Sequence, residues 1–139
     1  MKEKLFKIQN NKELKFTKDG KNPHFKNEYI TLDNLVETLK PVLEENRLCV
    51  FHTLEDKKLI TVVVDVDKKI GDEGEFVKSE FPIAEETIAN PQKVGSAITY
   101  AKRYNLGAIF NIITDEDDDG NTSIPKEKVA EEVKSSNRL

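Results

Sequence analysis

LITVVVDV, at residues 59–66, is the stretch that decides the fold. It is rich in β-branched residues, which favour strands, and its side chains alternate in character. Apolar residues occupy one face and polar residues the other, namely Ile60, Val62, Val64 and Val66 against Thr61 and Asp65. This alternation predicts a sheet that is covered on one face only.

Two further strand-like runs flank this stretch, at residues 48–53 and 76–83. The charged segment 54–58 and the glycine-bearing segment 69–75 have the composition of hairpin connections. In the third run we expect Val77, Phe81 and Ile83 to point inward, with Lys78 and Glu80 outward. Together the three runs predict a three-stranded antiparallel β-meander.

A helix is expected on either side of the meander. The first begins near Thr31, a suitable N-cap, because the apolar residues that follow repeat at helical spacing. Pro41 should kink this helix or mark its weakest point. The second begins at Asn90 and Pro91, an N-cap followed by proline at the first helical position, and runs to residue 106 or on to 112. The fold class is therefore α+β: helix, three-stranded meander, long helix.

The chain divides into three regions by composition, within a length of 139 residues that suits one domain. Residues 1–20 form a lysine-rich N-terminal arm or helix, and residues 21–121 form the core. Residues 122–139 are a polar C-terminal tail with a short helix expected at 126–133. This tail is too polar to anchor a core.

Composition also excludes several classes of protein. No stretch approaches the ~20 apolar residues of a membrane span, and the first residues lack the apolar run of a secretory signal. Cys49 is the single cysteine, so no internal disulfide can form and a reducing cytoplasm is expected. One cysteine and two histidines, His24 and His52, do not make a zinc site of the usual kind.

The net charge of −4 argues against a nucleic-acid partner, but the charges are unevenly distributed. Residues 1–26 carry eight lysines against three acids, and residues 87–114 carry three cations and no acid. Phosphate binding depends on local potential rather than total charge, so both regions suit nucleic acid. For the first region the alternative is a simply solvated end of the chain.

The expected second helix has two different faces. Its apolar stripe is Val94, Ala97, Ile98, Ala101 and Tyr104, continued by Ile109 and Ile112. The opposite face, at spacings of three, four and seven, is Ser96, Thr99, Tyr100 and Arg103. This polar face contains no acid and offers two hydroxyls, an aromatic ring and a guanidinium, which suit a nucleic-acid backbone and its bases. A protein–protein interface, where tyrosine and arginine are also enriched, is the alternative.

Three motifs in order carry a family resemblance. They are KNPHFKNEYITLDNL at residues 21–35, PVLEENRL at residues 41–48, and VGSAITYAKRY at residues 94–104 followed by DEDDDGN at residues 115–121. This set resembles the essential recombination function (ERF) family, which are phage-encoded single-strand annealing proteins. The resemblance implies a helix, three-strand, helix core, assembly into rings or helical filaments, and single-stranded DNA held along a basic groove. Because the chain is short, we expect it to lack any longer carboxy-terminal region of such families, which leaves open the partner that such a region recruits.

The resemblance also implies a function without catalysis: ATP-independent annealing of complementary strands in a bacterial host cytoplasm, through a complementary-strand duplex intermediate. No Gly-x-x-x-x-Gly-Lys-Ser/Thr phosphate loop is present. We expect Phe25 and Tyr29 to pack over the sheet edge, leaving His24 and nearby lysines to line the DNA path. The expected DNA-binding residues are Lys21, His24, Lys26, Lys93, Ser96, Thr99, Tyr100, Lys102 and Arg103.

The acidic run at residues 115–119 has several interpretations. Asp115, Asp117 and Asp119 match the first half of an EF-hand loop, but Lys126 stands where the bidentate glutamate belongs. Mg²⁺ held through one or two of these carboxylates is an alternative. The favoured interpretation is that the run pairs with a basic patch on the next subunit or with the lysine-rich arm of its own chain, where it competes with DNA.

Two rival functions remain. One is an adaptor for a host replication or single-strand-binding protein, which would not need the acid-free helix face. The other is a metal-dependent nuclease, which lacks carboxylates dispersed on strands beside a positioned lysine or histidine.

Overall fold

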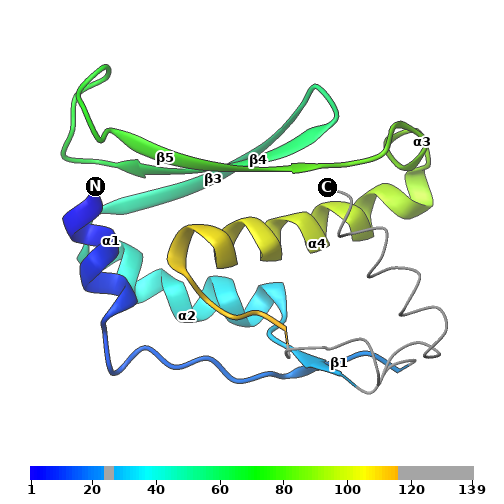
Figure 1. The fold of residues 1–139 in the computed structure, drawn as a ribbon, viewed down its shortest axis with the longest axis horizontal. Helices are drawn as coiled ribbons and strands as arrows, with labels where there is room; N and C mark the ends of the chain where they lie inside the picture. Colours follow the sequence, from blue (N-terminus) through cyan, green and yellow to red (C-terminus); the bar gives the residue numbers. More distant parts are fainter. Residues whose placement is uncertain (24–26, 116–139) are drawn as a thin grey trace, which may run out of the picture.

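The computed structural model describes residues 1–23 and 27–115. Figure 1 shows a curved sheet on one side, with two long helices beneath it and an extended run along the opposite side. The elements in chain order are α1 (Lys2–Gln9), β1 (Gly20–Lys21), β2 (Glu28–Tyr29), α2 (Leu32–Glu45), β3 (Leu48–Glu55), β4 (Lys58–Asp65), β5 (Phe76–Pro82), α3 (Glu85–Ile88) and α4 (Pro91–Phe110). The predicted α+β class, with helix, three-stranded meander and long helix, is confirmed.

The meander has the predicted order β3-β4-β5, with antiparallel pairing throughout. The residues of the third run that were expected to point inward do so. Val77 pairs with the buried Val63 and Phe81 with the buried Leu59, and Ile83, just after β5, is itself buried. The helices α1, α2 and α4 lie on the same side of this sheet, and the short α3 follows β5 at its end (Figure 1). The outer face has no covering element in the described part of the chain.

The apolar face of β4, however, is not the covered one. The buried residues are Leu59, Thr61, Val63 and Asp65, so Ile60, Val62 and Val64 belong to the outer face. Polar partners explain the inversion, because Thr61 is bonded by Asn105 and His52, and Asp65 by Lys4. A buried polar side chain is tolerated when it is hydrogen-bonded. Val66 lies beyond β4 and is half exposed.

Both long helices begin at the predicted caps. The Thr31 hydroxyl accepts from Asn34 N–H, and the Asn90 side chain accepts from Gln92 and Lys93 N–H with Pro91 first in α4. α2 continues through Pro41. α4 ends at Phe110, and its last half is buried through residues outside the predicted stripe, chiefly Leu106 and Phe110.

α4 ends in a reversal that brings the chain back along the helix. Asn111 adopts a left-handed conformation with φ 55°, and Ile112 N–H donates to Gly107 O at 2.9 Å. A Cβ on Gly107 would lie 3.0 Å from both Ile112 O and Thr114 Cγ2. Glycine therefore permits the close approach of this segment.

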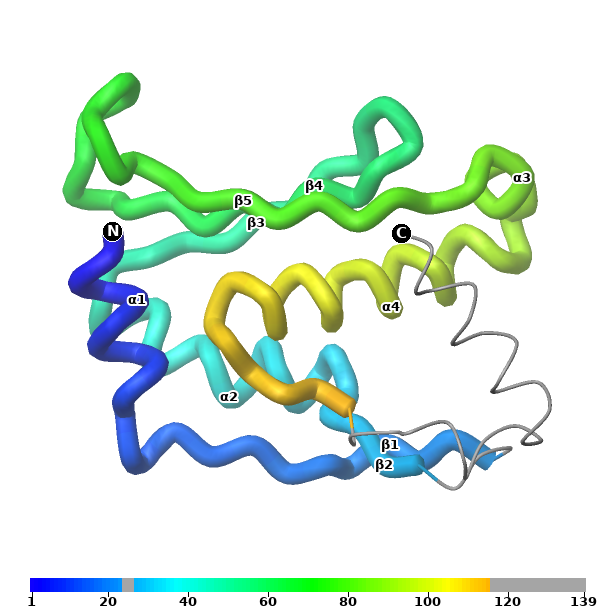
Figure 2. Tube along the Cα trace, viewed as in Figure 1, coloured from blue at the N-terminus to red at the C-terminus, as the bar shows by residue number. Residues whose placement is uncertain are grey.

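The lysine-rich start of the chain forms α1, the helix that was one of its two expected conformations. Ile8 is buried in the main core beside Leu39, Val63 and Phe110. Beyond α1, residues 10–23 run beneath α2 to the small β1–β2 sheet, as the tube in Figure 2 shows. None of the helices in the described ranges has the length and apolarity needed to cross a membrane. The expected tail helix at 126–133 lies outside the described residues.

Candidate nucleic-acid interface

A groove of about 710 Å³ lies between the start of α2 and the first half of α4. The α4 wall is built by Ser96, Thr99, Tyr100 and Arg103, the four residues predicted as one polar face, together with Gly95. The opposite wall consists of Tyr29, Thr31, Leu32 and Asp33. The structure thus brings the helix face that sequence spacing singled out into one concave surface.

The α4 wall of this groove offers hydroxyl groups and an aromatic ring to a ligand. Thr99 is exposed and donates to Gly95 O at 3.1 Å, which leaves its oxygen lone pairs able to accept a hydrogen bond. Tyr100 is 47% exposed, and its ring is held by Phe81 and Tyr104 at centroid distances of 5.7 and 4.5 Å. A ring that is both exposed and supported from behind is suited to stacking.

Arg103 was expected to face solvent on the polar side of the helix, but it is only 7% exposed. Its Nη1 donates to Asp115 Oδ1 at 2.9 Å and lies 3.5 Å from Ile30 O. Its guanidinium carbon stands 4.5 Å from the Tyr29 ring centroid, close enough for a cation–π contact. The correction has a physical reason: the chain after α4 returns and places a carboxylate against this cation.

Asp115 joins three segments at the edge of the groove. Its carboxylate accepts from Arg103 and from the Tyr104 hydroxyl at 3.1 Å, and its backbone bridges Tyr29 on β2. Ile30 N–H also donates to Thr114 O at 2.7 Å. Burial, assisted by Tyr100 and Asp115, raises the pKa of Tyr104 well above its ordinary value. The phenol therefore stays protonated and keeps donating to Asp115.

The remaining predicted DNA-binding residues are not gathered in this groove. Lys93 is exposed on the first turn of α4, and Lys21 is exposed on β1, the partner strand of Tyr29. Lys102 points to the other side of α4, where it lines a different cavity. His24 and Lys26 lie outside the described residues.

The metal interpretation receives no support from the described ranges. There, no three histidine, cysteine or acidic side chains come together in a way that could hold an ion. Asp115 is already bonded to Arg103 and Tyr104, and the other two candidates, Asp117 and Asp119, fall outside the described residues.

Sequence reasoning missed the α2 side of the groove. Tyr29 was expected over the sheet edge, yet its ring lies under Arg103 and lines the groove. The position of Tyr29 two residues before the Thr31 cap was a usable signal, because a side chain there lies next to the helix start. Nothing in the local sequence placed that start opposite α4.

The fold and the groove define a class: a small α+β protein whose long helix presents an acid-free polar face across from the start of a second helix. The chain belongs to the ERF superfamily, which it matches over residues 1–139. This match confirms the resemblance seen in the three motifs and links the chain to phage recombination. Neither the curated proteins nor the solved structures contain a match to it.

Proposed function

We propose that this chain binds single-stranded DNA and anneals complementary strands without a nucleotide cofactor, during phage homologous recombination in the bacterial cytoplasm. The observation that carries the proposal is the α4 wall of the groove, which has hydroxyls and an exposed ring. The helix that forms this wall, Pro91–Phe110, contains no acidic residue. Family membership supports it independently.

In this proposal the DNA backbone lies along the groove. The Ser96 hydroxyl donates to a phosphate oxygen, the Thr99 oxygen accepts from an N–H group of a base because its own hydrogen is donated to Gly95 O, and Lys93 and Lys21 supply charge on either side. A base stacks on Tyr100, a contact that contributes ~1–3 kcal/mol. Arg103 acts as a positioning residue, because its guanidinium orients Tyr29 and its charge is offset by Asp115.

Annealing requires the protein to hold DNA strands but not to make or break covalent bonds. Two strands must be held by their phosphates, with bases extended so that complementary edges can meet in a duplex intermediate. Hydroxyls and cations on a rigid helix achieve this without a catalytic group. We propose that the protein works as a homo-oligomeric ring or filament, with a host single-strand-binding protein as a further partner and Mg²⁺ as an optional aid.

Mixing the protein with two complementary oligonucleotides and following duplex formation by fluorescence quenching tests the function directly. We expect annealing well above the spontaneous rate with no ATP present, measured both with and without Mg²⁺. Two non-complementary strands are the control. A rate equal to the protein-free rate in both conditions would refute annealing as the function.

Salt dependence and groove variants test the site. Affinity for an oligonucleotide, measured by anisotropy, should fall steeply with salt because phosphate contacts release counterions. Tyr100→Ala should weaken binding about tenfold, whereas Tyr100→Phe should not, because only the ring is needed. Lys93→Ala should lower the salt slope by about one unit. A flat salt profile, or equal binding by both Tyr100 variants, would contradict a groove of this kind.

A further inference from the structure

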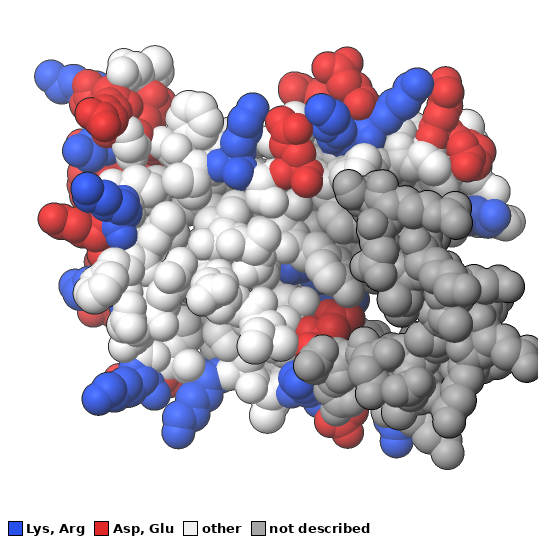
Figure 3. All heavy atoms as spheres, in the orientation of Figure 1, with Lys and Arg blue, Asp and Glu red and all other residues white. Residues whose placement is uncertain are grey.

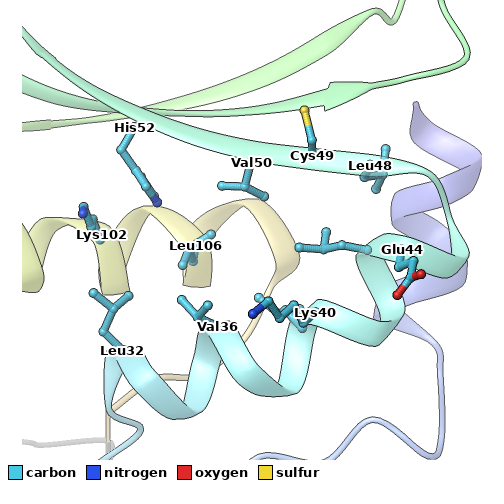
Figure 4. Close-up of a pocket in the computed structure, with 12 residues that line it drawn as sticks. Leu32, Val36, Lys40, Glu44, Leu48, Cys49, Val50, His52, Lys102 and Leu106 are labelled. Atoms are coloured by element: carbon cyan, nitrogen blue, oxygen red, sulfur yellow. The ribbon is translucent and has the colours of Figure 1, made fainter.

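A second groove, of about 490 Å³, opens on the other side of α4, between α2 and β3. Figure 4 shows its apolar floor and walls, with Leu32 and Val36 from α2, Val50 from β3 and Leu106 from α4. Val36 is 41% exposed on this surface. Of the residues that line it, only Leu32 also lines the proposed DNA groove.

The surroundings of this groove favour a protein occupant. β3 is an edge strand of the sheet, so its outer main-chain groups lack a strand partner in the described part of the chain. An open apolar groove beside an open edge is costly to leave in water and is typical of an interaction surface.

An apolar projection lies on the opposite side of the molecule. Ile113, in the short segment that follows α4, is 77% exposed. In Figure 1 this segment passes in front of α2. Figure 4 views the molecule from the side on which the groove opens, and there the segment passes behind α2. The segment and the groove therefore lie on opposite sides of the molecule. Figure 3 shows that the middle of the face bearing it is free of charged side chains, which gather at the loops and lower edge.

Charge matches the projection to the groove. Lys40 and Lys102 stand at the groove, and Lys102 forms no ion pair with any residue in ranges 1–23 and 27–115. Within the described ranges the ion pair of Lys40 is an exposed contact to Glu37 at 3.8 Å, and Glu44 is the one described acid in the lining. Ile113 is followed in sequence by the acidic run 115–119. The projection is thus apolar and is followed in sequence by acids, of which Asp115 is already bonded to Arg103, and the groove is apolar with cations beside it.

We propose that the groove of one copy receives the Ile113 side chain of a second copy, inserted among Val36, Val50 and Leu106, while Thr114 and Asp115 keep the contacts within their own copy. Because projection and groove lie on opposite sides, each copy can use both at once, and the contact is heterologous. Such head-to-tail contacts generate rings or open filaments. The inference names the surfaces of the assembly in the proposed function, but it depends on neither DNA binding nor annealing.

Three single variants test it, all by the same change to lysine. Ile113→Lys removes the projection, and Val36→Lys puts an ammonium in the apolar groove. Ile70→Lys is the matched control, since Ile70 is 96% exposed on the β4–β5 loop. By sedimentation velocity at micromolar concentration, parent and Ile70→Lys should form high-order species. Each of the other two should raise the dissociation constant about tenfold to a hundredfold, as expected for the loss of one buried side-chain contact.

Mixing the two defective variants gives the sharpest result. Ile113→Lys retains an intact groove and Val36→Lys an intact projection, so one native contact can form. We expect 1:1 heterodimers that grow no further, whereas either variant alone stays monomeric. A two-fold symmetric interface would instead give a parent protein that stops at two copies.

A parent protein that stays monomeric, or variants that assemble as the parent does, would overturn the inference. So would a mixture in which no heterodimer forms. Circular dichroism verifies that each variant is folded, which is expected because both sites are surface positions. Anisotropy with a short oligonucleotide separates this inference from the proposed function: Ile113→Lys should bind it like the parent, and loss of DNA binding by every protein would count against the function alone.

Discussion

Single charged residues of this chain are held by partners far away in sequence, and that decides what they can do. Arg103 is spaced like a solvent-facing residue, yet Asp115 and Tyr29 enclose it. Lys4, one of many lysines near the start, donates to Asp65 at 2.7 Å and to Asp67 at 2.9 Å. None of these four partners could be identified from local spacing.

Lys4→Ala should destabilise the protein by about 2 kcal/mol at neutral pH, because the buried Asp65 carboxylate loses its main cation while the N-terminus remains at 3.7 Å. Burial by itself would raise the pKa of Asp65, but Lys4, the Asp67 N–H and the N-terminus hold it below its usual value. A lowered folded-state pKa gives stability that is present above about pH 4 and lost as the pH falls further.

Urea melts between pH 7 and pH 3 measure this effect. The difference between Lys4→Ala and the parent should shrink below about pH 4 as Asp65 becomes protonated. Lys7→Ala, on the exposed side of the same helix, is the control and should change stability by less than about 0.5 kcal/mol. A difference that stays constant with pH would show that the ion pair is not its cause.

The elements themselves were largely predictable, whereas their orientation was not. Thr31, Asn90 and Pro91 marked both helix starts, because capping is a local property. The covered face of β4 was not local: Thr61 is buried because Asn105 of α4 donates to it at 3.0 Å. The short helix α3 and the β1–β2 pair left no periodic pattern long enough to detect. Of the candidate groove, only the α4 wall could be predicted, because its residues follow helical spacing within one segment. The α2 wall could not, because it lies opposite α4 only through tertiary packing.

α4 contains two glycines that should respond oppositely to the same substitution. Gly95→Ala should stabilise the protein by about 0.5–1 kcal/mol, because alanine favours helix and nothing lies within 4 Å of the added Cβ. Gly107→Ala should destabilise it by about 1–3 kcal/mol, because the Cβ meets the returning chain at 3.0 Å. Thermal melts of both variants provide the comparison, and a stabilised Gly107→Ala would show that the segment after α4 yields easily.

At the scale of the whole molecule, α4 is a wall shared by two grooves. Ser96, Thr99 and Tyr100 face one groove, while Lys102 and Leu106 face the other. The segment after α4 links them, because Asp115 fixes Arg103 at the first groove and neighbours the exposed Ile113. The proposed DNA contact and the proposed subunit contact are therefore on different surfaces of one rigid helix, so a strand could be held without blocking assembly.

This arrangement predicts that DNA promotes assembly only when one strand can span several copies. An oligonucleotide of about 50 nucleotides should lower the protein concentration needed for assembly at least tenfold, because copies on one strand meet at high effective concentration. One of about 8 nucleotides, near the size of a single site, should bind without this effect. Light scattering at fixed nucleotide concentration measures both. Ile113→Lys should bind the long strand without forming ordered assemblies, since the strand alone supplies no subunit contact. Equal promotion by short and long strands would instead indicate that DNA acts by changing the conformation of each copy.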